Sequence, residues 1–462
     1  MRKNRKQSRS GIALTWLFVG TIVLMMCLIS TRLVTSKLLV QRLGVENEWT
    51  DFVLFWSDLR RSPRKEQKEH KETETEYVDI DWATLYPFEG GEAAEQQESA
   101  WVTEKLRKKI FSMEDNIGKY ATDLLFGYRQ MTEAANRYES AIRWNYASCE
   151  EYNAVMELED GYFAGVTKKK DVTECAESTI TLANFCKSEG IDFLYVETPC
   201  KISKFEDTDI SGSIDFSNQN ADDFLAQLND AGIETFDLRI PMRETGLPHH
   251  SFFYNTDHHW KAETGLWASK LLLEELSDRF GLQTDPELLN ESNFDKVIYP
   301  DWFLGSQGKK VTLERTVPDD FTMIYPKFET RLHYAIPNLG IDETGDFSIT
   351  YDMSQVDKID YYGKSPYSTY NYADRPVIEI ENEQKDKSGK TLIIHNSFSN
   401  CVIPFLALDI KNVDALDLRH FTGSVENYIK GHKPDVVIVI YHCGVEGQEI
   451  DWTSHTSVFD FR

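Results

Sequence analysis

The sequence predicts an α/β fold in which helices flank a mainly parallel sheet, and three observations support it. Stretches of strand length alternate with stretches of helical length through residues 172–280. Near the end of the chain, residues 391–395 and 435–441 are rich in Ile, Leu or Val, which is typical of strands buried on both faces of a parallel sheet. A helix candidate at 424–430 precedes the second of these runs, as a crossover between parallel strands requires.

Each element is predicted from the spacing of apolar residues and from the residues that interrupt it. Gly190 and Gly232 follow two helix candidates, and the stretch 262–280 has the strongest helical pattern. A chain of 462 residues with 41% hydrophobic residues can bury one large core, which we place at 149–462. The predicted elements are, in order, a strand and turn at 153–163, a helix at 172–187, a strand at 191–196, a helix at 222–230, a strand at 233–236, a helix at 262–280, strands at 391–395 and 414–418, a helix at 424–430 and a strand at 435–441.

A β-rich insertion is expected at 310–385, where short alternating runs such as 321–325 and 347–351 stand among Asp, Gly and Pro. We expect it to line a substrate groove. Five tyrosines follow within this stretch, and tyrosine rings can stack on sugars while their hydroxyls bond to sugar hydroxyls. Ordinary packing within a loop is the alternative. These tyrosines are Tyr361, Tyr362, Tyr367, Tyr370 and Tyr372.

The N-terminal segment 1–33 is predicted to be a basic flank followed by a single transmembrane helix. Residues 10–31 contain no charged residue, and at ~1.5 Å per residue they extend about 33 Å, enough to cross a bilayer. The basic residues before them favour a cytoplasmic N-terminus and an extracytoplasmic body anchored at the cell membrane. A cleaved signal peptide is the alternative.

Residues 34–148 are predicted to connect this anchor to the body. The stretch 60–76 is almost wholly charged and indicates a solvated linker. Apolar residues at spacings of three or four over 106–142 predict a long helix. This helix either packs on the body or forms a dimeric stalk.

Charge and cysteine content exclude some classes of partner and site. The net charge of −26 argues against a nucleic-acid-binding protein, which needs a basic face. The cysteines outside the predicted anchor have no Cys-x-x-Cys spacing typical of zinc sites. They allow either disulfides or free buried thiols, and Cys401 and Cys443 are candidates to lie close together. These cysteines are Cys149, Cys175, Cys186, Cys200, Cys401 and Cys443.

The candidate site combines residues 256–260 with Ser397. Asp257 precedes His259 by two positions, so its carboxylate can orient that imidazole and stabilise its protonated form. Ser397 follows the predicted buried strand 391–395, and open α/β sheets carry their chemistry just beyond the carboxyl ends of strands. Asp257, His259 and Ser397 are therefore candidates for a nucleophilic triad.

The same residues resemble the DHHW family, named after the tetrapeptide that stands here at 257–260. Three further blocks occur in the family's order, at 237–250, 302–310 and 396–407. The family is similar to the SGNH-hydrolase-like proteins of alginate and other exopolysaccharide O-acetylation. The resemblance covers roughly 150–462 and implies an SGNH-hydrolase-like fold and the triad named above. This chain has Asn396 where the family often has Asp, and His395 is also unusual.

The resemblance implies an extracytoplasmic O-acetyltransferase with an acyl-serine intermediate and a polysaccharide acceptor. It also implies a membrane-bound O-acyltransferase as the partner that supplies acyl groups. We expect no cofactor and no metal. Candidate oxyanion donors are the Ser397 amide, the side chain of Asn396 or Asn400, and an amide near Thr198. His258 and Trp260 are expected to support the site.

Three alternatives remain open at the level of sequence. Water in place of a sugar hydroxyl would make the same triad an O-acetylesterase. Asp257, His258 and His259, with His249 or His250, could instead bind a metal, although neighbouring residues on a strand point to opposite faces. A polysaccharide-binding or assembly protein without catalysis is the third possibility.

Overall fold

A computed structural model describes residues 77–88, 146–148, 155–158, 161–206, 215–386, 389–452, 455 and 457–462. The predicted anchor at 1–33, the charged linker at 60–76 and the predicted helix at 106–142 lie outside these residues. Of the helices in the described part, none combines the length and the apolar character needed to cross a bilayer. The chain divides into two compact units, and every described residue belongs to the unit formed by 75–101 and 133–462.

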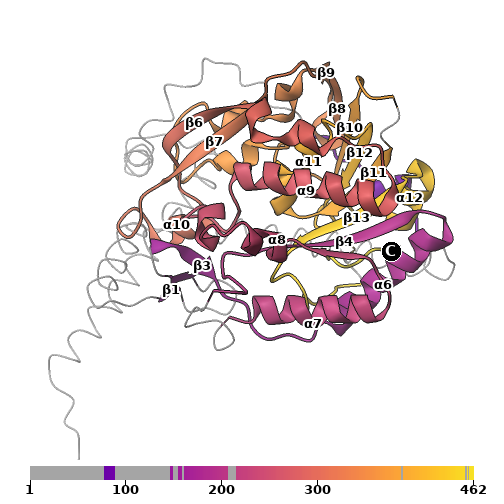
Figure 1. Ribbon diagram of the computed structural model, residues 1–462, viewed down its shortest axis with the longest axis horizontal. Helices are drawn as coiled ribbons and strands as arrows, with labels where there is room; N and C mark the ends of the chain where they lie inside the picture. Colours follow the sequence, from indigo (N-terminus) through magenta and orange to yellow (C-terminus); the bar gives the residue numbers. More distant parts are fainter. Residues whose placement is uncertain are drawn as a thin grey trace, which may run out of the picture. The chain divides into compact units, whose positions relative to one another are not determined.

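An eight-stranded mixed sheet forms the centre of the described unit (Figure 1). Its first five strands run parallel to one another, and the last three join the sheet by antiparallel pairing. The prediction of a mainly parallel sheet therefore holds for one part of the sheet. Across the sheet the strands are β5 (Thr235–Asp237), β4 (Asp192–Thr198), β13 (Val436–His442), β11 (Lys390–His395), β12 (Asn412–Leu416), β10 (Val377–Asn382), β8 (Leu332–Ile336) and β9 (Ile341–Gly345).

The antiparallel strands come from the predicted β-rich range 310–385, and they extend the main sheet instead of forming a separate layer. β10 is the junction, because it pairs with β12 on one side and with β8 on the other. A further strand of this range, β7 (Asp319–Pro326), pairs with β6 (Phe294–Phe303) in a two-stranded ribbon. The range therefore contributes to two sheets.

One strand expected in that range is a helix instead. The stretch 347–351 alternates apolar and polar residues, yet the structure has the 3₁₀ helix η8 (Phe347–Thr350) there. Asp346 accepts a hydrogen bond from the Ser348 N–H at 2.9 Å and so caps this turn. A short polar side chain that bonds to nearby backbone competes with strand pairing, which explains the wrong prediction.

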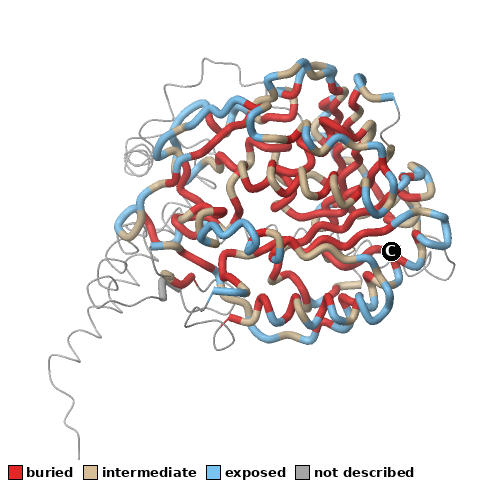
Figure 2. The backbone as a smooth tube through the Cα atoms, viewed as in Figure 1, coloured by how far each residue is buried: buried red, intermediate tan, exposed pale blue. Residues whose placement is uncertain are grey.

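Helices cover both faces of the sheet. α6 (Thr173–Ser188), α7 (Ser217–Asp230) and α12 (Val425–His432) pack with Phe193, Tyr195 and the β13 residues of the same face. α9 (Ala262–Phe280) and α11 (Ile403–Leu406) pack with Leu194 and Val196 on the other face. Side chains of one strand thus alternate between two cores, and the central strands are buried along their length (Figure 2).

The predicted helices and strands of the central part are confirmed within a few residues. α9 matches its predicted bounds, and Gly281 ends it in a left-handed conformation with φ of 70°. The remaining elements are small. They are α3 (Trp82–Leu85), β1 (Tyr146–Ser148), β2 (Val155–Glu157), β3 (Phe163–Gly165), α8 (Arg239–Glu244), η4 (His249–Phe252), η5 (Pro286–Leu289), η6 (Glu291–Asn293), α10 (Ser306–Val311), η7 (Pro337–Leu339), η9 (Met353–Gln355), η10 (Pro366–Thr369) and η11 (Ser397–Cys401).

Residues 77–88 lie on the same face as α12. Trp82 of α3 is buried, and its ring centroid lies 5.7 Å from that of Phe421. The Tyr86 carbonyl accepts the Ser424 N–H at 2.8 Å, and the Tyr86 ring lies 4.9 Å from Tyr428. This segment is therefore part of the folded body, although the neighbouring sequence is highly charged.

Candidate active site

Asp257, His259 and Ser397 lie in hydrogen-bond contact, although 138 positions separate the histidine from the serine. His259 Nδ1 lies 2.5 Å from Asp257 Oδ1, and His259 Nε2 lies 2.8 Å from Ser397 Oγ. Asp257 and His259 are buried, whereas Ser397 is partly exposed. One imidazole thus connects a carboxylate to a hydroxyl, which is the geometry that nucleophilic catalysis by serine requires.

Ser397 is placed by the end of β11. The strand stops at His395, and Ser397 begins the 3₁₀ helix η11. Asn396 caps this helix, because its side-chain oxygen accepts the Phe398 N–H at 3.2 Å. β11 lies between the parallel strands β12 and β13, so the serine stands at the carboxyl edge of the sheet, where α/β folds place their sites.

The loop that carries Asp257 and His259 is closed by its own backbone and by one buried acid. Phe253 and Trp260 form an antiparallel bridge across it. Asp319 accepts hydrogen bonds from the Asn255 N–H at 2.7 Å, the Thr256 N–H at 2.8 Å and the Thr256 hydroxyl at 2.6 Å. These contacts hold the turn that presents the two catalytic candidates.

The block 302–310 packs directly against this loop. The Ser306 N–H donates to Asp257 Oδ2 at 2.6 Å. Gly305 lies so close that a Cβ there would be 2.2 Å from the Asp257 Cβ, and a Cβ at Gly308 would be 2.6 Å from the Thr256 Cβ. Only glycine allows such an approach, which explains why Gly305 and Gly308 stand beside Ser306 in this block.

The Asp257 carboxylate is kept ionised by its partners. Burial alone would raise its pKa, but the neighbouring His258 and His259 imidazoles and the Ser306 N–H hold the pKa well below its usual value. An ionised Asp257 keeps the Nδ1 proton on His259 and leaves Nε2 free to accept the serine proton. The electrostatics of the site therefore favour His259 as a base.

Lys201 holds the loop that carries Asp257 and His259, and the sequence did not identify it. Its ammonium group donates to the carbonyls of Asn255 and Asp257, each at 2.8 Å, and to Gln307 Oε1 at 3.0 Å. It also donates to the Phe163 carbonyl. Four acceptors thus surround the Lys201 nitrogen, and its hydrogen bonds to them fix the backbone on which the catalytic candidates stand.

The protonation of Lys201 is shifted by this environment. Burial lowers its pKa to about 7, although the carboxylates of Asp257 and Asp319 act to raise it. In the sequence Lys201 is a polar residue after a strand, and most such lysines are exposed. Its position three residues beyond Thr198, the end of β4, was the one available signal.

Two aromatic rings contact the His259 imidazole. Tyr367 stacks on it with ring centroids 4.0 Å apart and planes 13° apart, and Phe398 lies 5.2 Å away. The Tyr367 hydroxyl donates to the Phe398 carbonyl at 3.1 Å, and Trp260 Nε1 donates to the same carbonyl at 2.9 Å. Trp260 and Tyr367 thus tie the histidine to the serine turn.

The predicted sugar-binding role fails for two of the five tyrosines. Tyr367 is occupied by His259, and Tyr370 is fully buried with its hydroxyl bonded to the Thr322 carbonyl at 3.0 Å. Tyr362 is 40% exposed, and the other tyrosines of this stretch are partly exposed. For these three the sugar-binding role stays a prediction.

Both side-chain amides that were expected to stabilise an oxyanion already make hydrogen bonds. Asn396 Nδ2 donates to His442 Nδ1 at 2.8 Å, and Asn400 Nδ2 donates to Asp374 Oδ1 at 3.0 Å. Each amide nitrogen carries two protons, so one proton remains on each for another acceptor. Their assignment as oxyanion donors stays a prediction.

His442 is a second residue that the sequence did not identify. It ends β13, and its ring stacks on Phe398 with centroids 4.5 Å apart and planes 4° apart. Burial, with the nearby His258 and His259, lowers its pKa well below the usual value. A neutral His442 can accept the Asn396 proton, so it orients the residue before Ser397.

The alternative metal site can be compared with the geometry. Asp257, His258 and His259 offer ligand atoms within 4.8 Å of one another. However, both ring nitrogens of His259 face other groups, and His258 Nδ1 lies 3.0 Å from Ser306 Oγ. A metal ion would have to displace the hydrogen-bond partners that these nitrogen atoms already have.

His249 and His250, which precede this cluster in the sequence, contact other residues. His249 Nε2 donates to the Cys200 carbonyl at 2.7 Å, and burial lowers the pKa of His249. His250 packs on the Tyr162 ring, with centroids 4.8 Å apart. Neither makes a described contact with the cluster at 257–259.

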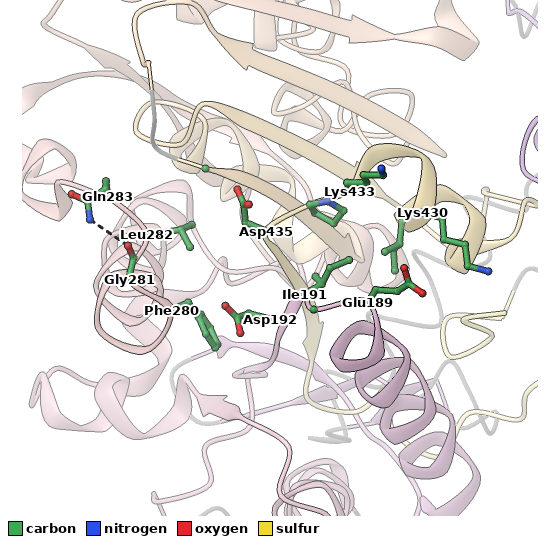
Figure 3. Close-up of a pocket in the computed structure, with 14 residues that line it drawn as sticks. Glu189, Ile191, Asp192, Phe280, Gly281, Leu282, Gln283, Lys430, Lys433 and Asp435 are labelled. Carbon is green, nitrogen blue, oxygen red and sulfur yellow. Dashed lines mark hydrogen bonds between the residues drawn. The ribbon is translucent and has the colours of Figure 1, made fainter.

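A cavity of about 680 Å³ lies away from these residues (Figure 3). Asp192, at the start of β4, and Asp435, just before β13, line it together with Lys430 and Lys433. These strands run parallel, so their starts and ends lie at opposite edges of the sheet. The cavity is therefore at the edge opposite Ser397 and has no part in the site described above.

Comparison with known proteins shows what this chain is similar to. Residues 166–293 match the family model described as SGNH hydrolase-like domain, acetyltransferase AlgX. The structure of Bacillus cereus PatB1 with a sulfonyl adduct is 16% identical and has a TM-score of 0.53, with 67% of this chain and 98% of that chain covered. No curated protein matches the chain.

Two further solved structures are similar at lower scores. A DHHW family protein from Eubacterium siraeum is 16% identical, with a TM-score of 0.49 and coverage of 66% of this chain and 95% of that chain. The O-acetyltransferase domain of Pseudomonas putida AlgJ is 14% identical, with a TM-score of 0.38 and coverage of 67% and 99%. The predicted resemblance is confirmed: residues 166–293 match the SGNH hydrolase-like model of the acetyltransferase AlgX, and the described fold is similar to that of PatB1.

Proposed function

We propose that the protein is an O-acyltransferase that transfers acetyl groups to a cell-surface or exported polysaccharide. The observation that carries this proposal is the continuous contact from Asp257 through His259 to Ser397, at 2.5 Å and 2.8 Å. The AlgX family model supports acetyl transfer over other acyl chemistry. The polysaccharide acceptor is inferred from the resemblance to exopolysaccharide O-acetylation proteins.

The reaction proceeds in two halves on one serine. In the first, His259 Nε2 takes the Ser397 proton while Oγ attacks the carbonyl carbon of an ester or thioester. The bond to the donor oxygen or sulfur then breaks, and the leaving group takes the proton from His259. Asp257 stabilises the imidazolium that exists between these steps, and an acyl-serine remains.

The second half returns the enzyme to its starting state. A sugar hydroxyl gives its proton to His259, and its oxygen attacks the acyl carbon. The bond from that carbon to Ser397 Oγ breaks, and the serine regains a proton from His259. The product is an acetylated sugar, and no cofactor or redox step is needed.

Charge on the carbonyl oxygen requires hydrogen-bond donors in both halves. We propose the Ser397 amide as the first donor and the second proton of Asn396 or Asn400 as another. Loss of one such donor typically costs about 3 kcal/mol of transition-state stabilisation. Asn396 is the better candidate of the two side chains, because it caps the helix that begins with Ser397.

The surroundings that we propose for the enzyme follow from its N-terminal sequence and its resemblance. Residues 1–33 would anchor the protein in the cell membrane by a single span, with the domain outside. A membrane-bound O-acyltransferase would supply acyl groups from the membrane, and the anchor would keep the domain next to it. No nucleic acid is expected as a partner, since the net charge is −26.

Two other functions use the same scaffold. Hydrolysis by water at the acyl-serine would give a carbohydrate O-acetylesterase, and the triad geometry is compatible with it. A polysaccharide-binding or assembly role would need no reactive serine. The contact between Ser397 Oγ and His259 Nε2 at 2.8 Å favours an enzyme, because a binding role does not require it.

Labelling of the serine tests the chemistry. A fluorophosphonate or sulfonyl fluoride probe should modify wild type at Ser397, and Ser397→Ala should not react. Ser399→Ala, which keeps Ser397 in the same helix, is the matched control and should still be labelled. Folded wild type that neither reacts nor cleaves 4-nitrophenyl acetate would contradict the enzyme and leave the binding role.

A second assay separates transfer from hydrolysis. Acetate release from an activated ester is compared with and without acetyl-free exopolysaccharide oligosaccharides, and the products are analysed by mass spectrometry. A transferase yields acetylated oligosaccharide and less free acetate. Release of acetate alone, with no acetylated sugar for any oligosaccharide, identifies an esterase.

A further inference from the structure

Two cysteines from distant parts of the sequence face each other beside the candidate site. Cys200 follows β4 by two residues, and Cys443 follows β13 directly. β4 and β13 are parallel neighbours, with Thr198 opposite His442, and the Cys443 N–H donates to the Thr198 carbonyl at 2.9 Å. The two sulfur atoms lie 3.6 Å apart.

This separation is close to what a disulfide needs. A sulfur–sulfur bond is about 2.05 Å long, so the atoms must approach by about 1.5 Å, which rotation of side chains can supply when the backbones are this near. The backbone bond between Cys443 and Thr198 keeps the two strand ends together. The sequence made Cys401 a candidate neighbour of Cys443, but Cys401 Sγ instead lies 3.3 Å from the Tyr367 hydroxyl.

Other contacts of the two thiols are weak and can be given up. Cys200 Sγ lies 3.4 Å from Ser217 Oγ, and Cys443 Sγ lies 3.5 Å from Asn218 Oδ1. Sulfur makes poor hydrogen bonds, and Ser217 Oγ already donates to Asp215 at 2.6 Å. Formation of a bond between the sulfurs therefore leaves no strong donor or acceptor without a partner.

We propose that Cys200 and Cys443 form a reversible intrachain disulfide. A small disulfide such as oxidised glutathione is the oxidant. The Cys200 thiolate attacks it, since Cys200 is partly exposed while Cys443 is 2% exposed, and one glutathione thiolate leaves. The Cys443 thiolate then attacks the Cys200 sulfur and releases the second glutathione thiolate. Two thiols are oxidised, one glutathione disulfide is reduced, and the protons of the two cysteines pass to solvent.

The bond would connect two supports of the candidate site. Cys200 is adjacent to Lys201, which holds the Asp257 carbonyl, and Cys443 is adjacent to His442, which holds Asn396. The Cys200 carbonyl also accepts from His249. Oxidation thus fixes the ends of β4 and β13 relative to each other on the edge where Asp257 and Ser397 meet.

Thiol mapping on the full chain tests the proposal without any measurement of acyl transfer, so its outcome is independent of the proposed function. The protein is equilibrated with reduced and oxidised glutathione in series, quenched with acid, alkylated and digested. We expect a cross-linked Cys200–Cys443 peptide that grows as glutathione becomes more oxidised and disappears after reduction. Cys175, Cys186 and Cys401, which are buried, should be alkylated only after unfolding.

Single substitutions check the identity of the pair. Cys200→Ser and Cys443→Ser should each abolish the cross-linked peptide, whereas Cys401→Ser should leave it unchanged. The proposal is overturned if both cysteines remain reduced in oxidised glutathione alone. It is equally overturned if Cys200 stops at a glutathione adduct or pairs with another cysteine such as Cys149. Because the main measurement uses the wild-type protein, its result does not depend on whether each variant folds.

Discussion

Substitution of Gly305 by alanine tests most directly the placement of the loop that carries Asp257 and His259. The backbone at Gly305 has φ of −73°, a conformation that alanine adopts freely, so only the added methyl group matters. That carbon would lie 2.2 Å from the Asp257 Cβ, whereas ordinary contact begins at 3.4 Å. Asp257 and Gly305 must therefore separate by about 1.2 Å.

The size of the effect follows from this displacement. A shift of about 1 Å in a positioned catalytic group can cost roughly 10²-fold in rate, which corresponds to about 2.7 kcal/mol. The folded state should lose about 1–3 kcal/mol, as is usual when a packed site receives an extra carbon. Gly305→Ala should thus stay folded at 25 °C and lose most of its reactivity.

The rate of labelling by a fluorophosphonate probe measures the loss, and thermal unfolding measures the stability. Gly431→Ala is the matched control, because a Cβ at Gly431 in α12 meets only the Tyr86 ring edge at 3.9 Å. It should keep the wild-type rate. If folded Gly305→Ala reacts at the wild-type rate, the carboxylate of Asp257 does not orient His259 for attack by the serine.

Three further predictions concern groups around the imidazole. Asp257→Asn should lower the labelling rate by about 10³–10⁴-fold, because the amide favours the wrong tautomer of His259; unchanged reactivity would remove Asp257 from the triad. Tyr367→Phe keeps the stacked ring and should lose only about 1 kcal/mol of stability, as measured by denaturant unfolding. Tyr367→Leu removes the stacked ring and should lower the labelling rate about tenfold or more, because the imidazole is no longer held in place. Equal labelling rates for the two variants would contradict a role for stacking. The pKa of Lys201 is lowered to about 7, so between pH 7 and 9 the unfolded state binds more protons than the folded state, and stability rises with pH by up to about 1.4 kcal/mol per unit. Lys201→Met should lose this slope while the exposed Lys187→Met keeps it, and parallel pH curves of unfolding free energy for all three proteins would refute the assignment.

Sequence predicted those parts of the site that local spacing encodes. Asp257 and His259 stand two positions apart, and Ser397 follows a predicted strand whose centre, 392–394, is apolar, so each was recognisable alone. Lys201 and His442 were missed because they reach the site through the pairing of β4 with β13. Such a register depends on residues far apart in the chain, and no local pattern records it.

The same distinction explains the fold. α9 was predicted to the residue, because the spacing of its apolar positions is a local signal. The attachment of β10 to β12 was not predicted, because antiparallel pairing at the edge of a parallel sheet leaves no trace in either strand. The helix η8 was mistaken for a strand, since a capping bond from Asp346 outweighed the alternation of apolar residues.

The docking of residues 77–88 has a practical consequence for expressing the described domain alone. Trp82 and Tyr86 cover Phe421 and Tyr428, so a protein shortened to begin after Phe88 would expose a bare aromatic surface. Surfaces of that kind promote aggregation. Expression of the domain should therefore start upstream of Tyr77, so that the segment can cover these rings.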